Sequence, residues 1–202
     1  MGSHVGIIIL PILLSVLVAV PLGWVASRSA RWGGLIAQLC QLVYVVPILA
    51  MMVLFPALVG LPLRSPWTLS AVLTVYGVAL LVRTAMEAFH SVPSEQVEVA
   101  RACGYSRWQR VWGVHVPLAA PVVVSGVRIV AMSTIAMASM GAVVGIPSLG
   151  SLLTDGFQRG LLGEVMVGIV SIMLLALLVD GLIMVGSRLL FPWARGRHGG
   201  AQ

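Results

Sequence analysis

Five long apolar segments constrain the fold of this chain more than any other feature of its sequence. A helix needs roughly 20 apolar residues to cross the hydrocarbon core of a bilayer, and lipid offers no hydrogen-bond partner to a non-helical backbone. Charged residues make up only 9% of the 202 residues, whereas soluble domains carry about 25%. We therefore predict an all-α integral membrane protein with about five transmembrane helices in a single domain, 1–202. The expected spans are Val5–Ser27, Gly34–Val59, Trp67–Phe89, Val114–Val144 and Leu162–Leu190.

The arginines predict how the chain is oriented in the membrane. No Arg or Lys precedes the first span, whereas Arg28 and Arg31 follow it, which is the reverse of a secretory signal peptide. We therefore expect a retained first helix with its N-terminus outside and the C-terminus inside. Eight arginines then lie inside, against Arg64 and Arg159 outside, as the positive-inside rule requires. The net charge of +6 thus reflects cytoplasmic loops, and no basic run with interleaved aromatics points to a nucleic-acid partner.

A polar segment with several arginines, Glu98–Pro117, lies between the third and fourth apolar runs. Gly104 suits the position just after a helix end. Ser106 and Gln109 have the spacing of a capping box at the start of another helix. We expect two short helices that meet at Gly104–Tyr105 on the cytoplasmic side, although the caps alone would also fit an ordinary helical connector.

Arg83, Arg128 and Asp180 lie within apolar runs. Arg83 and Glu87 are four residues apart on one helix face near the cytoplasmic end, so they can pair and reach toward water. Arg128 lies eleven residues after Pro117, roughly 16 Å along a helix, and Asp180 is expected at a similar depth. Because an isolated charge at this depth is unfavourable, we predict that Arg128 pairs with Asp180 and joins the fourth and fifth spans.

The sequence contains no convincing catalytic, metal-binding or nucleotide-binding set. Ser148 lacks the flanking pattern of a nucleophile elbow. The four histidines are scattered, and the chain has no lysine and hence no phosphate-binding loop of the usual kind. We expect no enzymatic activity and no cofactor bound by this chain.

The spacing of the polar segment resembles the EAA loop of importer-type ABC permeases. In that family, Glu-Ala-Ala is followed three residues later by Gly and, after nine more residues, by Ile-x-Leu-Pro. Here Glu98-Val99-Ala100, Gly104 and Val114-His115-Val116-Pro117 occupy those positions, with Val99 as the departure in the triplet. The resemblance implies a coupling loop at about 90–113 that contacts an ATPase. The coupling residues that it implies are Glu98, Ala100, Gly104, Tyr105, Ser106, Arg107, Trp108 and Pro117.

Nearly the whole chain resembles the osmoprotectant branch of these permeases, within the methionine-permease-like superfamily. The matching stretches are Val20-Pro21-Leu22-Gly23, Ser27-Arg28-Ser29, Tyr76, Val82-Arg83-Thr84, Arg107-Trp108-Gln109-Arg110, Ala119-Ala120-Pro121 and Gly126-Val127-Arg128. Two stretches depart from the branch, Tyr44-Val45-Val46-Pro47 and Gly145-Ile146-Pro147-Ser148-Leu149-Gly150. Both departures lie where substrate would pass.

The resemblance implies a type I importer core in the plasma membrane of a bacterium. The implied partners are a second permease chain of the same or a related sequence, two cytoplasmic ATPase subunits that hold ATP and Mg, and an extracytoplasmic substrate-binding protein. The implied substrate is a quaternary-amine osmoprotectant of the glycine betaine, choline, carnitine or proline type. Another small amino-acid-like solute, such as methionine or a betaine-like thiol, is the alternative substrate. An ATP-independent secondary transporter or channel is the alternative class, although it would not need an ordered cytoplasmic segment.

Overall fold

The computed structural model describes residues 2–193, which form helices joined by turns, with no strand among them. Two short segments are not α-helical: η1 is a π-helical turn, and η2 is a 3-10 helix. The elements in chain order are α1 (Gly2–Ser27), α2 (Ala30–Val45), α3 (Ile48–Val59), α4 (Pro66–His90), α5 (Ser94–Ala102), α6 (Arg107–Arg110), η1 (Val111–His115), α7 (Val116–Ala138), η2 (Ser139–Val144), α8 (Gly150–Arg159) and α9 (Leu162–Leu190).

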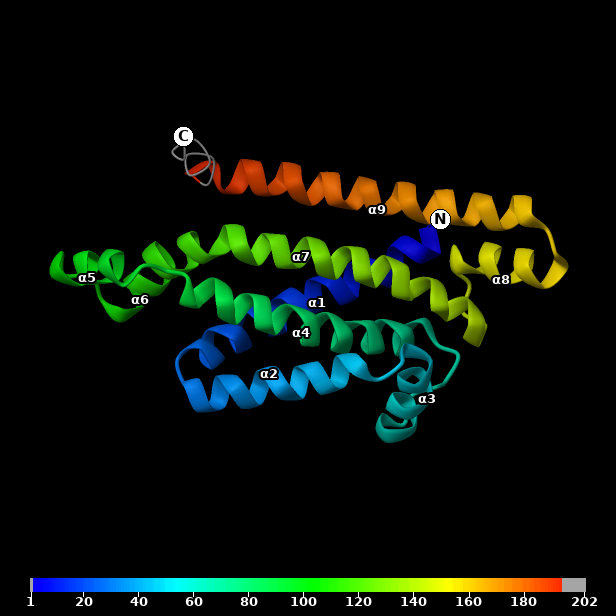
Figure 1. Cartoon of the computed structure of the whole chain (residues 1–202), viewed down its shortest axis with the longest axis horizontal. Helices are drawn as coiled ribbons and strands as arrows, with labels where there is room; N and C mark the ends of the chain where they lie inside the picture. Colours follow the sequence, from blue (N-terminus) through cyan, green and yellow to red (C-terminus); the bar gives the residue numbers. More distant parts are fainter. Residues whose placement is uncertain (1, 194–202) are drawn as a thin grey trace.

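The long helices form an elongated bundle in which α1, α4 and α7 lie at the centre (Figure 1). Helices α2 and α3 cover one side, and α9 runs along the other. Small residues let the central helices approach closely. A Cβ atom added at Gly23 of α1 would lie 2.6 Å from the Ala85 Cβ of α4, and one at Gly126 of α7 would lie 2.8 Å from the Thr84 Cγ2.

Four helical segments within residues 2–193 are long and apolar enough to cross a membrane, and the bent pair α2–α3 adds a fifth crossing if it counts as one. The prediction of an all-α chain with about five spans is confirmed. The start of α1 and the end of α9 lie at opposite ends of the bundle (Figure 1), as an odd number of crossings requires. Helices α5 and α6 lie at the α9 C-terminal end, and α8 lies at the other.

The expectation of one continuous helix over Gly34–Val59 is wrong. Helices α2 and α3 meet at a bend of 109°. Val46 is extended, with φ −62° and ψ 128°, because Pro47 disfavours a helical conformation in the residue before it and has no N–H to donate. The Tyr76 hydroxyl of α4 donates a hydrogen bond to the Val46 carbonyl. This bond gives the Val46 carbonyl a donor at the point where the helical hydrogen bonds of the backbone are interrupted.

The fourth span begins earlier than Val114, and the second short helix is not a separate element. The chain is helical without a break from Arg107 to Val144, through α6, η1, α7 and η2. Pro117 falls in the first turn of α7, and the π-helical turn that precedes it joins α6 to α7. Helix α6 is therefore continuous with a helix long enough to span the membrane.

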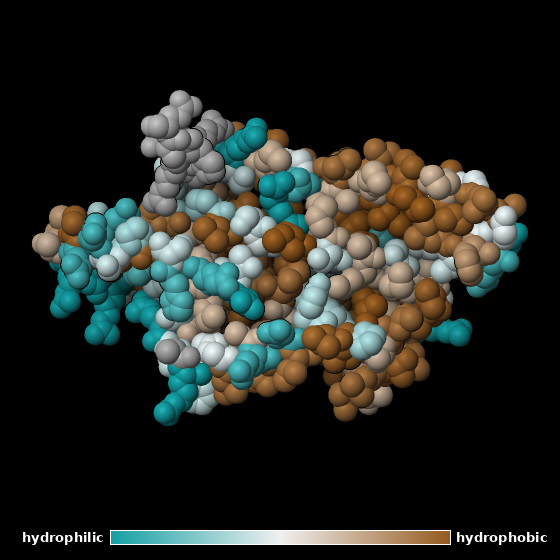
Figure 2. Space-filling view, in the orientation of Figure 1, coloured by the Kyte–Doolittle hydropathy of each residue, from teal (hydrophilic) through white to brown (hydrophobic). Residues whose placement is uncertain are grey.

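The two ends of the bundle differ in polarity. Hydrophilic residues gather at the end that carries α5 and α6, whereas apolar side chains dominate the surface over α9 and α3 (Figure 2). In the most apolar part of α9 only 6% of the residues are buried within the chain. This helix therefore presents most of its surface to lipid or to another chain.

Candidate coupling site at the polar end

The C-terminal end of α5 is closed by a Schellman motif centred on Gly104. The Tyr105 N–H donates to the Ala100 carbonyl at 3.0 Å, and the Gly104 N–H donates to the Arg101 carbonyl at 3.0 Å. Gly104 has φ +81°, a left-handed conformation that glycine adopts without steric penalty. The predicted helix end at Gly104 is confirmed.

The next helix starts with the predicted capping box. The Ser106 Oγ accepts from the Gln109 N–H at 3.3 Å, and the Gln109 Oε1 accepts from the Ser106 N–H at 2.8 Å. Only Tyr105 separates this cap from Gly104. The direction of α5 relative to α6 is therefore set by hydrogen bonds at both ends of the four-residue connection, 103–106.

The polar end of the bundle, which carries α5 and α6, has some side chains packed against the chain and others exposed. Ala100 is 8% exposed. The Tyr105 ring covers the backbone of Gly113, where an added Cβ would lie 3.6 Å from its Cε1. The side chains of Val99 and Trp108 are 63% and 74% exposed. An exposed aromatic and an exposed aliphatic residue on a fixed helix pair offer a surface on which another protein can dock.

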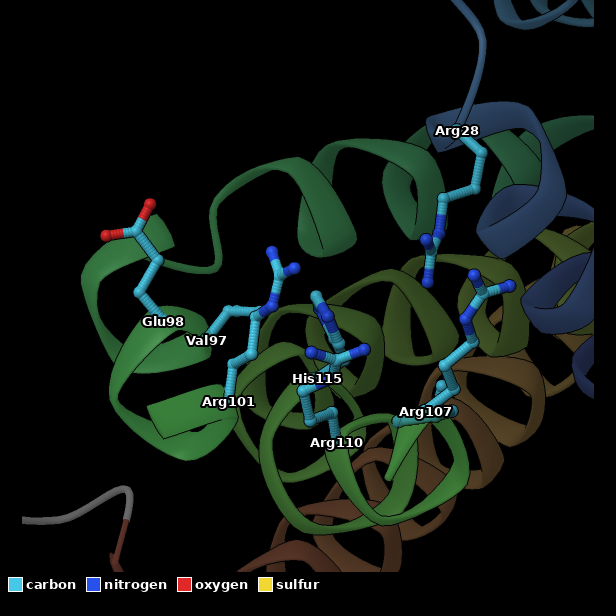
Figure 3. Close-up of a pocket in the computed structure, with 8 residues that line it drawn as sticks. Arg28, Val97, Glu98, Arg101, Arg107, Arg110 and His115 are labelled. Carbon is cyan, nitrogen blue, oxygen red and sulfur yellow. The ribbon is translucent and has the colours of Figure 1, made fainter. Parts of the chain in front are cut away.

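Glu98 and Arg101 lie on the same short helix, and their spacing would allow an internal ion pair. In Figure 3 the Glu98 carboxylate points away from the Arg101 guanidinium, and the ion pairs present within residues 2–193 do not include either residue. Glu98 is therefore available to a partner. Arg107 lines the same cavity as Arg101.

Pro117 lies at the base of this region rather than on its exposed tip. Its carbonyl accepts a hydrogen bond of 3.1 Å from the Trp193 Nε1, just beyond the end of α9. The sequence offered no sign of this contact between residues that are 76 positions apart. The contact fastens α9 to the start of α7, and the role of Pro117 in coupling stays a prediction.

The two ion pairs that the sequence predicted are present. Arg128 of α7 donates to Asp180 of α9 through two parallel hydrogen bonds, Nε to Oδ1 at 2.6 Å and Nη2 to Oδ2 at 2.7 Å. This bidentate geometry is the strong form of the arginine–carboxylate interaction. Arg83 and Glu87 of α4 form an exposed pair at 3.1 Å. Both pairs have the partners that their positions predicted.

Nothing in the sequence pattern connects Arg28 with the polar end. Arg28 follows the last residue of α1, yet it lines a cavity together with Arg101, Arg107 and Arg110 (Figure 3). Its guanidinium lies 4.1 Å from the centre of the Trp24 ring. The positive-inside count placed these arginines on one side of the membrane but said nothing about their distances.

Residues 9–192 match the family described as "Binding-protein-dependent transport system inner membrane component". The Osmoprotectant import permease protein OsmW of Salmonella typhimurium is 30% identical over 183 residues, which cover 90% of this chain and 85% of that protein. The Choline transport system permease protein OpuBB of Bacillus subtilis is 29% identical over 190 residues, covering 94% of this chain and 86% of the relative.

Solved structures share the fold at lower identity. A chain of the MetNI methionine ABC transporter in an inward-facing conformation superposes with a TM-score of 0.75 at 19% identity, covering 95% of this chain and 92% of that one. A chain of an amino acid ABC transporter crystallised with histidines gives a TM-score of 0.75 at 13% identity, covering 93% and 91%. The family match extends over nearly the whole chain, and the fold agrees with it. The chain therefore belongs to the family of inner membrane components of binding-protein-dependent transport systems.

Proposed function

We propose that this chain is the permease subunit of an ATP-driven importer in which a separate cytoplasmic ATPase docks on α5. The observation that carries the proposal is the shape of the polar end. It presents two short helices joined by a turn that Gly104 and Ser106 fix, and their exposed residues include Glu98 of α5 and Trp108 of α6. The EAA-like spacing of these residues supports the same role.

The continuous helix from Arg107 to Val144 explains how docking at the surface can act within the membrane. The α5 helix is joined to α6 by a turn with hydrogen bonds on both sides. A movement imposed on α5 therefore displaces α6 and α7 together. Helix α7 contacts both α4 and α9, so the displacement reaches the centre of the bundle and the outer helix. In this scheme the ATPase holds ATP and Mg. This chain supplies the helices that move and the path by which the substrate crosses the membrane.

The orientation that fits this function places α5 in the cytoplasm and the start of α1 outside. Arg28, Arg31 and the arginines of α5 and α6 gather at one end, whereas Arg64 and Arg159 lie in segments at the other (Figure 1). This distribution follows the positive-inside rule. An extracytoplasmic binding protein would then meet the end that carries α8, and a second permease chain would complete the path.

We propose a quaternary-amine osmoprotectant as the substrate. The support comes from relatives whose names state choline transport and osmoprotectant import. A small amino-acid-like solute is the second candidate, because the chain departs from the branch at Tyr44–Pro47 and Gly145–Gly150. In this structure the first departure coincides with the 109° bend between α2 and α3.

Reconstitution of the chain with its ATPase and binding protein in proteoliposomes tests the proposal. We expect uptake of labelled choline or glycine betaine that requires both ATP and the binding protein. Replacing residues 94–113 by a glycine–serine linker should leave a membrane-inserted chain that no longer retains the ATPase. ATPase retention by that variant would rule out α5 as the docking element. Uptake driven by an ion gradient without ATP would rule out the importer.

A further inference from the structure

Four arginines from separate parts of the chain surround one cavity at the polar end. Arg28 comes from the end of α1, Arg101 from α5, and Arg107 and Arg110 from α6. The cavity has a volume of about 450 Å³. Figure 3 shows the guanidinium groups of Arg28, Arg101 and Arg107 turned toward the same space. Residues far apart in the sequence thus form one strongly basic hollow.

None of these four arginines forms an ion pair within residues 2–193. Glu98 is the acidic residue of the lining, and its carboxylate points away from the arginines (Figure 3). The ion pairs present in this part of the chain involve Arg83 and Arg128 instead. Like charges held around one cavity repel each other, so a bound anion would relieve an unfavourable arrangement.

One wall of the cavity lies at the end of a candidate membrane span. Arg28 directly follows the membrane-spanning part of α1, His4–Ser27, and its guanidinium packs on the Trp24 ring. The Trp24 ring in turn contacts Phe89 and His115, with centroid distances of 4.9 and 4.8 Å. Tryptophan is enriched at membrane–water interfaces. The aromatic cluster therefore supports Arg28 at the boundary between apolar and polar regions.

Arginine is the side chain best suited to phosphate, because its planar guanidinium can donate two parallel hydrogen bonds to phosphate oxygens. The volume of about 450 Å³ is enough for a phosphate group with part of a headgroup. We propose that this cavity is a binding site for a phosphate-bearing anion. The phosphate of an anionic phospholipid headgroup is one source, since basic pockets on the cytoplasmic side of membrane helices bind such headgroups, and soluble phosphate is the other.

The lipid source is tested on the purified 202-residue chain by native mass spectrometry, after exchange into mixed phosphatidylcholine and phosphatidylglycerol nanodiscs. We expect phosphatidylglycerol to be retained selectively and to bind about thirtyfold more weakly to Arg28→Gln/Arg110→Gln. Neither residue belongs to the predicted coupling set. The matched control is Arg64→Gln/Arg159→Gln, which removes the same charge at the opposite end and should leave retention unchanged. Arg28→Lys/Arg110→Lys keeps the charge and should restore part of the binding.

The soluble source is tested by titrating inorganic phosphate into the same chain in phosphatidylcholine nanodiscs and following the phosphorus NMR signal. A saturable shift that Arg28→Gln/Arg110→Gln removes, without selective lipid retention, would assign the site to a soluble phosphate. Equal losses in both double Gln variants would show that net charge alone attracts the lipid, and the proposal would fail. The proposal would also fail if neither anion bound and the arginines became protected only when the ATPase was added. Transport enters neither measurement, so these outcomes are separate from those that test the importer.

Discussion

Replacing Gly104 by valine should destabilise the turn between α5 and α6 and thereby weaken ATPase binding. Gly104 has φ +81°, and a Cβ added there would meet no heavy atom within 4 Å. The penalty therefore comes from the backbone alone and amounts to about 1–2 kcal/mol for a residue with a side chain in this conformation. Since 1.4 kcal/mol corresponds to a factor of ten, the closed turn should become about tenfold less favoured relative to open forms.

Hydrogen–deuterium exchange measures this opening directly. The amide of Tyr105, which donates to the Ala100 carbonyl, should exchange about tenfold faster in Gly104→Val. The affinity for the ATPase should fall by up to the same factor, because only chains with the closed turn can bind it and fewer chains are then in that state. Gly104→Asn should lie between glycine and valine, since asparagine tolerates this conformation better.

Gly160 provides a matched control at the other end of the bundle. It has φ +69° with no heavy atom within 4 Å of an added Cβ. The N–H groups of Gly160 and Leu161 donate to Phe157 and Gly156, in the same pattern as at Gly104. Gly160→Val should therefore raise exchange locally without changing ATPase affinity. Wild-type exchange and ATPase binding in Gly104→Val, or an equal loss of ATPase binding in both variants, would show that the backbone conformation of Gly104 does not control docking.

Three further predictions concern single contacts. Arg128→Met and Asp180→Leu should each lower the melting temperature of the transporter in detergent, and the double substitution should recover part of the loss because no charge is then left unpaired. Strictly additive losses would mean that the pair does not stabilise the bundle. Tyr76→Phe should reduce the free energy of unfolding by about 1–3 kcal/mol, because the Val46 carbonyl would lose its donor; an unchanged denaturant midpoint would contradict this. Glu98→Arg should reduce ATP-dependent uptake, and an acidic substitution on the ATPase surface should restore it if Glu98 meets a basic groove there.

The features that the sequence predicted well depend on contacts between residues close in the chain. Apolar runs must become helices in lipid whatever surrounds them. The caps at Gly104 and Ser106 use hydrogen bonds that span three to five residues. Such contacts form wherever the segment is placed in the fold, so they can be predicted from the sequence alone. The same holds for the pair Arg83–Glu87, whose members lie one helical turn apart.

The pair Arg128–Asp180 was predicted from the sequence even though its members lie far apart in the chain. Matching depths along two apolar runs suggested it, and the fold brings together residues that are 52 positions apart. Depth can be counted from a sequence, but the direction in which a helix face points cannot. The packing of α7 against α9 decides that Arg128 faces Asp180.

The proline residues show most clearly what tertiary structure alone decides. Pro11 and Pro21 lie inside α1, and Pro121 lies inside α7, without ending the helix. Pro47 has the same missing N–H and the same ring, yet the chain there bends by 109°. The effect of proline on the backbone alone does not separate these positions, whereas at Pro47 the Tyr76 hydroxyl of another helix donates to the Val46 carbonyl.

Arg28 is a second case in which the tertiary structure was decisive. Its sequence neighbours connect it with α1, whereas the fold places it beside Arg101, Arg107 and Arg110. The amino-acid sequence by itself determined which segments are apolar enough to enter the membrane, where the first short helix ends and the next begins, and which end of the bundle carries most of the positive charge. Only the tertiary structure decided where a helix breaks and which distant charges share a cavity, because both depend on partners supplied by other helices.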